Sequence, residues 1–364
     1  MPPRLLSLDV FRGLIIAFMV IVNTAGTGNA VYPPLRHAKW HGWTPTDVVF
    51  PSFVWIIGVA ISLSLGRKLD AGAARGPLLL TAARRTAILF ALGLLVYAFP
   101  TFDGATFRIL GVLQRLAICY FFTVAIFLYT GIRGQVIAAV SCLLGFALLM
   151  FYAPVPGYGA GNLDVERNFA HYLDRIVLGA HNYAHTKTWD PEGVLTTLPA
   201  IGSCLIGLLA GHLLASKRDL AVRTTGMLII GNVLIALAFM WDPWLPINKS
   251  LWTSSFVLLM AGLDFVMFAS ILWLVDGLGY RRGLSPVVIM GRNAIAVYMA
   301  SELIDVTLQS IPMAGTTMRV WLYETFFAPL ASPMNASLLY AVSYMLLMLG
   351  VAFLLHRRGW YLRA

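Results

Sequence analysis

The sequence predicts an all-α membrane protein, built as a bundle of about ten transmembrane helices. Hydrophobic residues make up 59% of the 364 residues and charged residues only 12%, about half the charged share of a soluble protein. The apolar stretches have lengths near the roughly 20 residues that a helix needs to cross a bilayer. No polar block is large enough to fold separately, so residues 1–364 are predicted to form one transmembrane domain.

The apolar stretches follow one another along almost the whole chain. The predicted spans cover residues 8–25, 47–66, 79–99, 110–130, 134–152, 193–215, 222–240, 250–275, 285–307 and 336–356. The segment 318–331 is too short and too polar to span, and is predicted to be an interfacial or re-entrant helix. The first stretch also has features of a cleaved signal peptide, but Asp9 and Arg12 at its start favour a retained span.

The distribution of basic residues predicts the orientation in the membrane. One set lies densely in short connectors: Arg4, Arg67, Lys68, Arg75, Arg84, Arg85, Arg133, Lys217, Arg218, Arg223, Arg281, Arg282, Arg357, Arg358 and Arg363. The opposite set is spread over longer loops: Arg36, Lys39, Arg108, Arg167, Arg175, Lys187, Lys249 and Arg319. Cytoplasmic loops are enriched in Lys and Arg, so both termini are predicted inside, with the loop around His37 and the segments 153–192 and 308–335 outside.

This topological use of charge argues against nucleic-acid binding, although the net charge is +10. The sequence also argues against a metal site, since it has no CxxC or HExxH motif, and a P-loop is missing too. The three cysteines lie inside apolar runs, where they are expected to be small buried hydrophobic residues: Cys119, Cys142 and Cys204.

The stretch Leu35–Phe50 combines groups that a plain membrane connector does not need. His37, His41 and Asp47 lie in it together with two tryptophans. Histidine can take up or release a proton near neutral pH, and a fixed carboxylate can orient its ring. A tight turn through residues 42–45 would bring His37 and Asp47 within hydrogen-bonding distance. The alternative is a short surface loop with an interfacial belt of aromatic residues.

Motifs along most of the chain resemble those of the heparan-alpha-glucosaminide N-acetyltransferase family of transmembrane N-acetyltransferases. They are SLDVFRGL (Ser7–Leu14), Asn23, HAKWHGWTPTDVVFPSFVWIIG (His37–Gly58), GVLQRLAICYF (Gly111–Phe121), DPEGVL (Asp190–Leu195), NKSLW (Asn248–Trp252) and GRNAIAVY (Gly291–Tyr298). Two features depart from the family pattern. The connection from Asn23 to His37 is a few residues longer, and His41 stands where the family commonly has a residue that does not titrate.

The resemblance implies transfer of an acetyl group from cytoplasmic acetyl-CoA to an amino or hydroxyl group of an outward-facing sugar or glycan. His37 would be the general base, or a nucleophile that forms an acyl-histidine. Asp47 would orient the His37 ring and stabilise the imidazolium. Asn23 matches an asparagine of the family's active site, where its amide would steady the developing oxyanion.

Ionisable and polar groups near the predicted spans supply the candidate binding residues. Arg12, Arg292 and Asn293 are expected at the phosphates of acetyl-CoA, although a local Asp9–Arg12 ion pair is an alternative. The candidate acceptor-binding residues are Trp40, Gln114, Arg115, Glu192, Lys249 and Glu302. Glu302 shares a helix face with Asp305, and pairing of these carboxylates with Arg115 is an equally open interpretation. Asp264, in the eighth predicted span, is assigned no role.

A transporter of a small molecule or lipid-linked glycan is the alternative function, since it would also have about ten spans and midplane charges. No internal repeat supports it, and a third option is a catalytically inactive scaffold. The lack of the large N-terminal lumenal extension of the lysosomal enzyme suggests a bacterial cytoplasmic membrane protein that modifies an envelope glycan. The expected partners are acetyl-CoA, a sugar or glycan acceptor and the bilayer; homodimer formation is left open.

Overall fold

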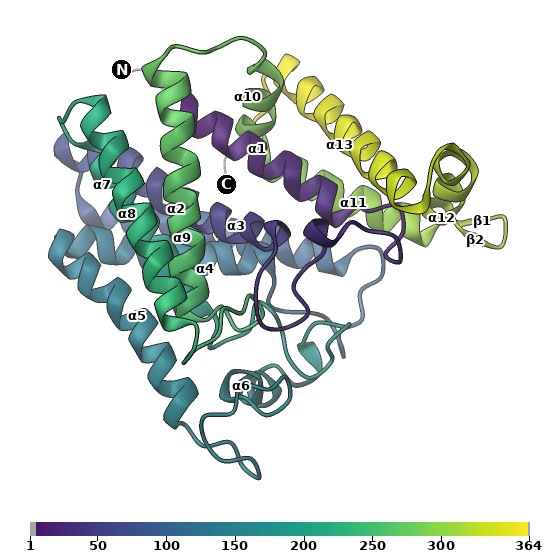
Figure 1. The fold of residues 1–364 in the computed structure, drawn as a ribbon, viewed down its shortest axis with the longest axis horizontal. Coiled ribbons are helices and arrows are strands. Elements are labelled where there is room, and N and C mark those ends of the chain that lie inside the picture. Colours follow the sequence, from purple (N-terminus) through teal and green to yellow (C-terminus); the bar gives the residue numbers. More distant parts are fainter. Residues whose placement is uncertain (1–4, 363–364) are drawn as a thin grey trace.

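The computed structural model describes residues 5–362 and is a bundle of helices with one short hairpin (Figure 1). Its helices are α1 (Leu6–Asn23), α2 (Pro45–Asp70), α3 (Arg75–Ala98), α4 (Val112–Tyr129), α5 (Ile132–Tyr152), α6 (Phe169–Val177), α7 (Thr197–Ala215), α8 (Leu220–Trp241), α9 (Ser254–Leu272), α10 (Ser285–Arg292), α11 (Ala294–Ser310), α12 (Met318–Leu322) and α13 (Pro333–Arg357). The hairpin pairs β1 (Pro312–Met313) with β2 (Thr316–Thr317). The all-α class is therefore confirmed.

Within residues 5–362, nine helices are long and apolar enough to cross a membrane: α1 to α5, α7, α8, α13, and α9 with its π-helical continuation to Gly277. A tenth crossing is possible if α10 and α11 form one broken span, because these helices are bent by 80° relative to each other. The multi-pass architecture is thus confirmed, whereas the side that faces the cytoplasm stays a prediction. Arg4 and Arg363, which belong to the predicted cytoplasmic set, lie outside the described residues.

The break between α10 and α11 interrupts what the sequence predicts as one span. Asn293 joins the two helices with non-helical dihedral angles, φ −113° and ψ 20°. Before it, α10 lies directly against α1: a Cβ at Gly291 would come within 2.0 Å of the Asp9 carbonyl oxygen, and one at Gly13 within 1.9 Å of the Val287 carbonyl oxygen. Hydropathy alone does not register such a backbone contact, so the bend could not be predicted.

Helix α2 lies at the centre of the bundle, and its first turn carries Asp47 of the candidate site. Its Trp55 is 1% exposed and packs edge-on against Phe11 of α1 and Phe265 of α9, with ring centroids 6.1 and 5.5 Å apart. Aromatic contacts of this kind add to the dispersion energy of a close-packed core. The position of α2 relative to α1 and α9 is therefore fixed by large buried side chains.

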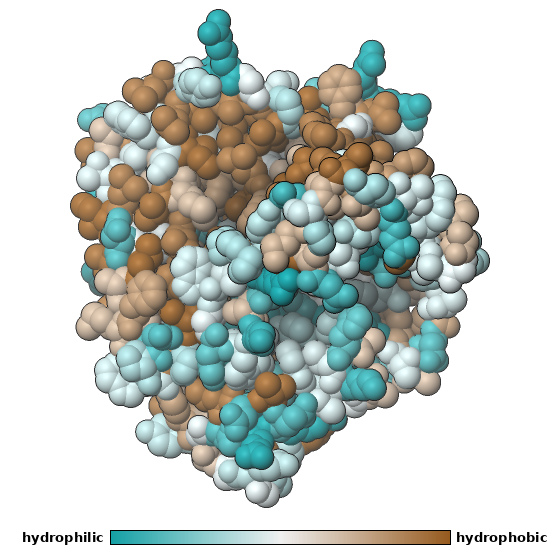
Figure 2. Space-filling view, turned by 45° about the vertical axis from the view of Figure 1, so that its right-hand side comes forward, coloured by the Kyte–Doolittle hydropathy of each residue, from teal (hydrophilic) through white to brown (hydrophobic). Residues whose placement is uncertain are grey.

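Four connections meet at one end of the bundle, the lower side in Figure 1, which we call the site face: residues 24–44, 99–111, 153–196 and 242–253. The Trp40 indole donates to the Leu163 carbonyl oxygen at 3.1 Å, and the Gly42 N–H donates to Ile247 at 2.7 Å. Figure 2 shows hydrophobic residues over the upper part of the molecule and hydrophilic residues gathered lower down. On the face shown, many hydrophilic residues therefore lie on the same lower side of the molecule as these connections.

The segment predicted to be interfacial, 318–331, is helical but short. It consists of α12, a π-helical turn at Tyr323–Phe327 and a 3-10 turn at Ala328–Leu330. Arg319 anchors it by an ion pair with Asp305 of α11 at 3.1 Å. The segment is not among the helices long enough to span, as predicted.

The orientation can be tested by placing a cysteine at Lys39, an exposed residue of the loop between α1 and α2. In a background without the three native cysteines, we expect Lys39→Cys to react with a membrane-impermeant thiol reagent in intact cells, because the basic-residue asymmetry puts this loop outside. Mass spectrometry of the labelled protein measures the reaction. Labelling only after the membrane is broken open would reverse the predicted orientation.

Candidate active site

His37 and Asp47 form a short hydrogen bond at the start of α2. The distance from His37 Nδ1 to Asp47 Oδ1 is 2.6 Å, and the His37 side chain is 52% exposed while that of Asp47 is 1% exposed. The other carboxylate oxygen of Asp47 accepts from the backbone N–H of Thr44 at 3.0 Å and of Ala38 at 3.1 Å. The hydrogen bond from the Thr44 N–H is one half of a capping box, and it satisfies a backbone group that would otherwise be unpaired at the helix terminus. Asp47 is therefore held rigidly, and it engages Nδ1, which leaves Nε2 for proton transfer.

The turn between α8 and α9 brings a lysine to the same pair. Lys249 Nζ lies 3.5 Å from Asp47 Oδ1 and 3.1 Å from His37 Nδ1. The preceding Asn248 is fully buried and accepts from the Leu251 N–H at 2.9 Å, which fixes the turn. Burial lowers the pKa of Lys249, and the charges of Asp47 and Glu192 oppose that shift.

A buried arginine cluster adjoins this group on the site face. Arg108 donates to both oxygens of Asp190, at 2.8 and 2.6 Å, and to Glu192 at 2.6 Å. Its guanidinium also lies 4.8 Å from the ring centroid of Tyr97 and 4.4 Å from that of Tyr183. Burial disfavours the charge, but hydrogen bonds and charges from Asp190 and Glu192 outweigh it and raise the pKa of Arg108. Glu192 is therefore hydrogen-bonded to Arg108 and also lies in electrostatic range of Lys249.

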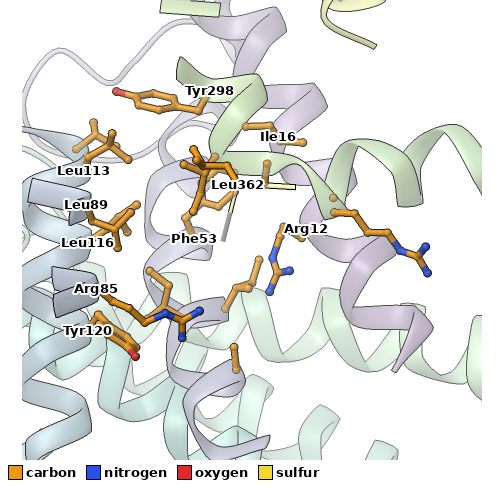
Figure 3. A pocket seen from close by; sticks show the side chains of 18 of the residues that line it. Arg12, Ile16, Phe53, Arg85, Leu89, Leu113, Leu116, Tyr120, Tyr298 and Leu362 are labelled. Carbon is orange, nitrogen blue, oxygen red and sulfur yellow. The ribbon is translucent and has the colours of Figure 1, made fainter. Parts of the chain in front are cut away.

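A cavity of about 550 Å³ lies between α1, α2, α3, α4, α10 and α11 (Figure 3). Its walls are mostly apolar, including Ile16, Phe53 and Leu113, and Leu362 beyond α13 also lines it. Figure 3 shows Tyr298 at one end of the cavity and Arg85 toward the other. Tyr298 lies in electrostatic range of Tyr97, Glu302 and Glu192. Arg85 thus marks a basic end of the cavity, and Tyr298 at the other end lies in electrostatic range of acidic groups of the site face.

Three arginines line the cavity: Arg12, Arg85 and Arg292. Two of them flank Asp9, since Arg12 Nη1 lies 3.9 Å from Asp9 Oδ1 and Arg292 Nε lies 3.5 Å from Asp9 Oδ2. The Asp9–Arg12 ion pair considered from the sequence is thus present. It does not conflict with a role at the cavity, because both arginines also line it.

Comparison with known proteins shows the family of this chain. A family model described as "Heparan-alpha-glucosaminide N-acetyltransferase, catalytic" matches residues 4–247. The chain belongs to this family. It is 31% identical over 359 residues to heparan-alpha-glucosaminide N-acetyltransferase of Homo sapiens, covering 84% of this chain and 54% of that protein. The corresponding Mus musculus protein is 30% identical over 362 residues, covering 83% and 54%. The chain spans about half the length of these curated relatives.

His41, which departs from the family pattern, lies apart from the His37–Asp47 pair in its contacts. Its Nδ1 is 3.4 Å from Asn248 Nδ2, and burial lowers the pKa of His41. Trp40 is directed toward the connection 153–196, where its ring packs edge-on against His171 and Trp189. In this member of the N-acetyltransferase family, His41 and Trp40 therefore both make contacts that hold connections of the site face together.

Gln114 and Arg115, predicted to bind acceptor, are 0% and 1% exposed. Arg115 donates to the Gly193 carbonyl oxygen and the Thr196 hydroxyl, and its guanidinium lies 4.9 Å from the ring centroid of Trp252. Neither residue lines the cavity. In this family member Arg115 therefore joins α4 to the residues just before α7, and its contact with an acceptor stays a prediction.

Asn23 and Glu302 come together from different helices. Asn23 is exposed at the end of α1, and its amide hydrogen-bonds to the Glu302 carboxyl group of α11. Glu302 also lies in electrostatic range of Arg108. Its neighbour Asp305 pairs with Arg319 instead, so the suggested Asp305–Arg115 pair is not formed.

Asn293 is 2% exposed and donates to the Ile289 carbonyl oxygen at 3.0 Å. It is not among the cavity-lining residues, and its observed role is at the α10–α11 break. Asp264 is fully buried and accepts from the Ser52 hydroxyl at 2.5 Å, a contact between α2 and α9.

Sequence reasoning missed Arg85, Arg108, Asp190 and Tyr97 as site residues. Asp190 belongs to the DPEGVL motif, which was a usable signal. Arg108 and Asp190 are 82 residues apart and meet only through the fold. Arg85 stands beside another arginine inside α3, and both belong to the basic set that predicts the topology, so the pattern did not distinguish Arg85 from a topological charge.

Proposed function

We propose that this protein is a membrane-embedded N-acetyltransferase that moves an acetyl group from acetyl-CoA to the amine of a sugar acceptor. The observation that carries the proposal is the His37–Asp47 hydrogen bond on the site face, together with a separate cavity that runs from a basic end to Tyr298. The donor would enter at the basic end, and the acceptor would approach the exposed His37 ring.

The cavity suits the chemistry of acetyl-CoA as a substrate. Guanidinium groups form strong charge-assisted hydrogen bonds with phosphate, and Arg12, Arg85 and Arg292 provide three of them. The apolar walls suit the pantetheine arm, and a volume of about 550 Å³ lies within the usual range of small-molecule sites. We therefore assign the diphosphate to the basic end and the thioester to the end near Tyr298.

Two routes use the same residues. In direct transfer His37 Nε2 removes the proton of the acceptor amine, the nitrogen attacks the thioester carbonyl, and the C–S bond breaks to release CoA. In the two-step route Nε2 itself attacks the carbonyl, CoA leaves, and the amine then takes the acetyl group from the imidazole. In both, Asp47 stabilises positive charge on the ring, and the Asn23 amide is proposed to donate to the oxyanion.

For the acceptor we propose an amino sugar or an amine-bearing glycan. Glu192 and Glu302 lie near the proposed reaction centre and provide carboxylates for polar groups of a sugar. An envelope glycan acceptor and a bacterial cytoplasmic membrane location belong to the same proposal.

The decisive experiment incubates the purified full-length protein with labelled acetyl-CoA and a panel of amino sugars. Acetylated sugar and free CoA, formed in equal amounts, would support the proposal. Heat-inactivated protein and N-acetylated sugars are the controls. Absence of both products, together with uptake of an amino sugar into proteoliposomes, would favour the transporter alternative.

Replacement of cavity arginines tests the donor site. We expect Arg292→Ala and Arg85→Ala to weaken acetyl-CoA binding by about 10-fold or more, because each removes a charge-assisted phosphate contact. Turnover at saturating donor should change less. Calorimetric titration with acetyl-CoA measures the affinity, and Arg84→Ala, an exposed neighbour outside the cavity, is the matched control. Unchanged affinity in both cavity variants would move the donor site elsewhere.

A further inference from the structure

The position of Lys249 relative to the His37 ring is unusual for a residue that binds only substrate. Its Nζ lies 3.1 Å from Nδ1 and 3.5 Å from Nε2, so the amine sits beside the ring and close to both nitrogens. It also lies 3.5 Å from Asp47 Oδ1, the same oxygen that bonds to His37. The Lys249 side chain is 22% exposed, so solvent screens these interactions only in part.

The negative charge of Asp47 explains why a positively charged side chain is needed next to the His37 ring. A buried carboxylate next to an imidazole favours the imidazolium form. An imidazolium can neither accept a proton nor attack a carbonyl. A lysine ammonium on the same carboxylate oxygen supplies the compensating positive charge, and at about 3 Å from the ring nitrogens it repels a second positive charge on the ring. Asp47 can then orient the ring without holding it in the charged form.

We propose that Lys249 is a positioning residue that keeps His37 uncharged beside Asp47, so that Nε2 stays able to accept a proton or an acetyl group. This role rests on the proposed function of His37, and it differs from the acceptor contact that the sequence suggested for Lys249.

The other charged groups around the pair come from three connections. Glu192, which precedes α7, lies in electrostatic range of Lys249 but is also bonded to Arg108. His41 lies in the same loop as His37, and its own charged neighbours are Asp164 and Asp242. Burial lowers the pKa of Lys249, while Asp47 and Glu192 act to keep it charged. Removal of Lys249 would therefore leave His37 as the nearest cationic partner of Asp47.

Chemical modification tests this without requiring turnover. Diethyl pyrocarbonate reacts with uncharged imidazole, so its reaction rate at His37, followed by peptide mass spectrometry from pH 5 to 9, reports the charge of the ring. In Lys249→Met we expect the rise in His37 reactivity to occur at a higher pH than in the wild type, because the compensating positive charge is gone. Lys249→Arg, which keeps the charge, should follow the wild type.

Lys39→Met is the matched control, since it removes an exposed lysine from the loop that carries His37. It should leave the His37 profile unchanged, and His41 in the same digest reports whether the loop is intact. If Lys249→Met does not fold, Lys249→Gln removes the charge while keeping a hydrogen-bond donor. A wild-type His37 profile in an intact, uncharged Lys249 variant would overturn the proposal. Failure of every acetylation assay would instead count against the proposed function and leave this measurement valid.

Discussion

Replacing His37 by alanine should lower turnover by about 100-fold or more, the usual effect of removing a positioned proton acceptor. Binding of acetyl-CoA should be nearly unchanged, because His37 does not line the cavity. The fold should also persist, since half of the His37 side chain is exposed. Steady-state acetylation rates, measured together with donor affinity, separate these effects.

Two companion variants sharpen the test. Asp47→Asn should also reduce the rate, because an amide cannot stabilise the imidazolium, yet it can still accept the helix-capping N–H of Thr44. His41→Ala should have a milder effect, since its contact is with Asn248 rather than with Asp47. An inactive His41→Ala with an active His37→Ala would assign the base to the other histidine. If neither histidine matters, the loop is only a connector and the enzyme hypothesis fails.

Replacing Arg108 by methionine should give the largest loss of stability on the site face. It would leave Asp190, which is fully buried, and Glu192, which is 8% exposed, without the cation to which both are hydrogen-bonded. Removing one member of a buried ion pair costs about 3–5 kcal/mol, since the remaining charge has lost its water without compensation. Thermal unfolding of the detergent-purified protein should therefore occur at a clearly lower temperature.

Arg167 provides the matched control for this change. Its side chain is 56% exposed and its ion pair with Asp164 is 4.0 Å long, so Arg167→Met should change stability by only about 0.5 kcal/mol or less. Arg108→Lys should be intermediate, because lysine keeps the charge but loses the two-pronged contact with Asp190. Equal unfolding temperatures for the two methionine variants would show that the arginine cluster does not hold the connections together.

The sequence predicted the helices well because a bilayer requires long apolar stretches whose backbone is satisfied internally. It also predicted that His37 and Asp47 meet, since they are close in the chain and the intervening residues favour a turn. Their hydrogen bond of 2.6 Å confirms that expectation. The catalytic role of the pair stays a prediction.

Contacts between distant segments could not be predicted in the same way. Lys249 reaches His37 across 212 residues, and nothing in the NKSLW motif specifies its partner. Arg108 looked like one of several loop charges until the fold placed it against Asp190. Gln114 and Arg115 were predicted at the acceptor because they are polar within an apolar run. In the fold, Arg115 Nη2 donates to Gly193 and Thr196, whereas Nε and Nη1 are buried without a hydrogen-bond partner among the described residues. Hydropathy does not indicate these contacts.

Helix α11 contributes to both ends of the proposed reaction path. Ala294, Ile295 and Tyr298 line the cavity, while Glu302, one turn further along, meets Asn23 on the site face. Any tilt of α11 that accompanies donor binding would also move the carboxylate offered to the acceptor. Thermodynamic linkage then requires each ligand to change the affinity of the other by the same factor. An affinity for the donor measured without the acceptor would then describe only one of the four binding steps of a thermodynamic cycle. The coupling free energy between the two ligands would depend on the position of α11.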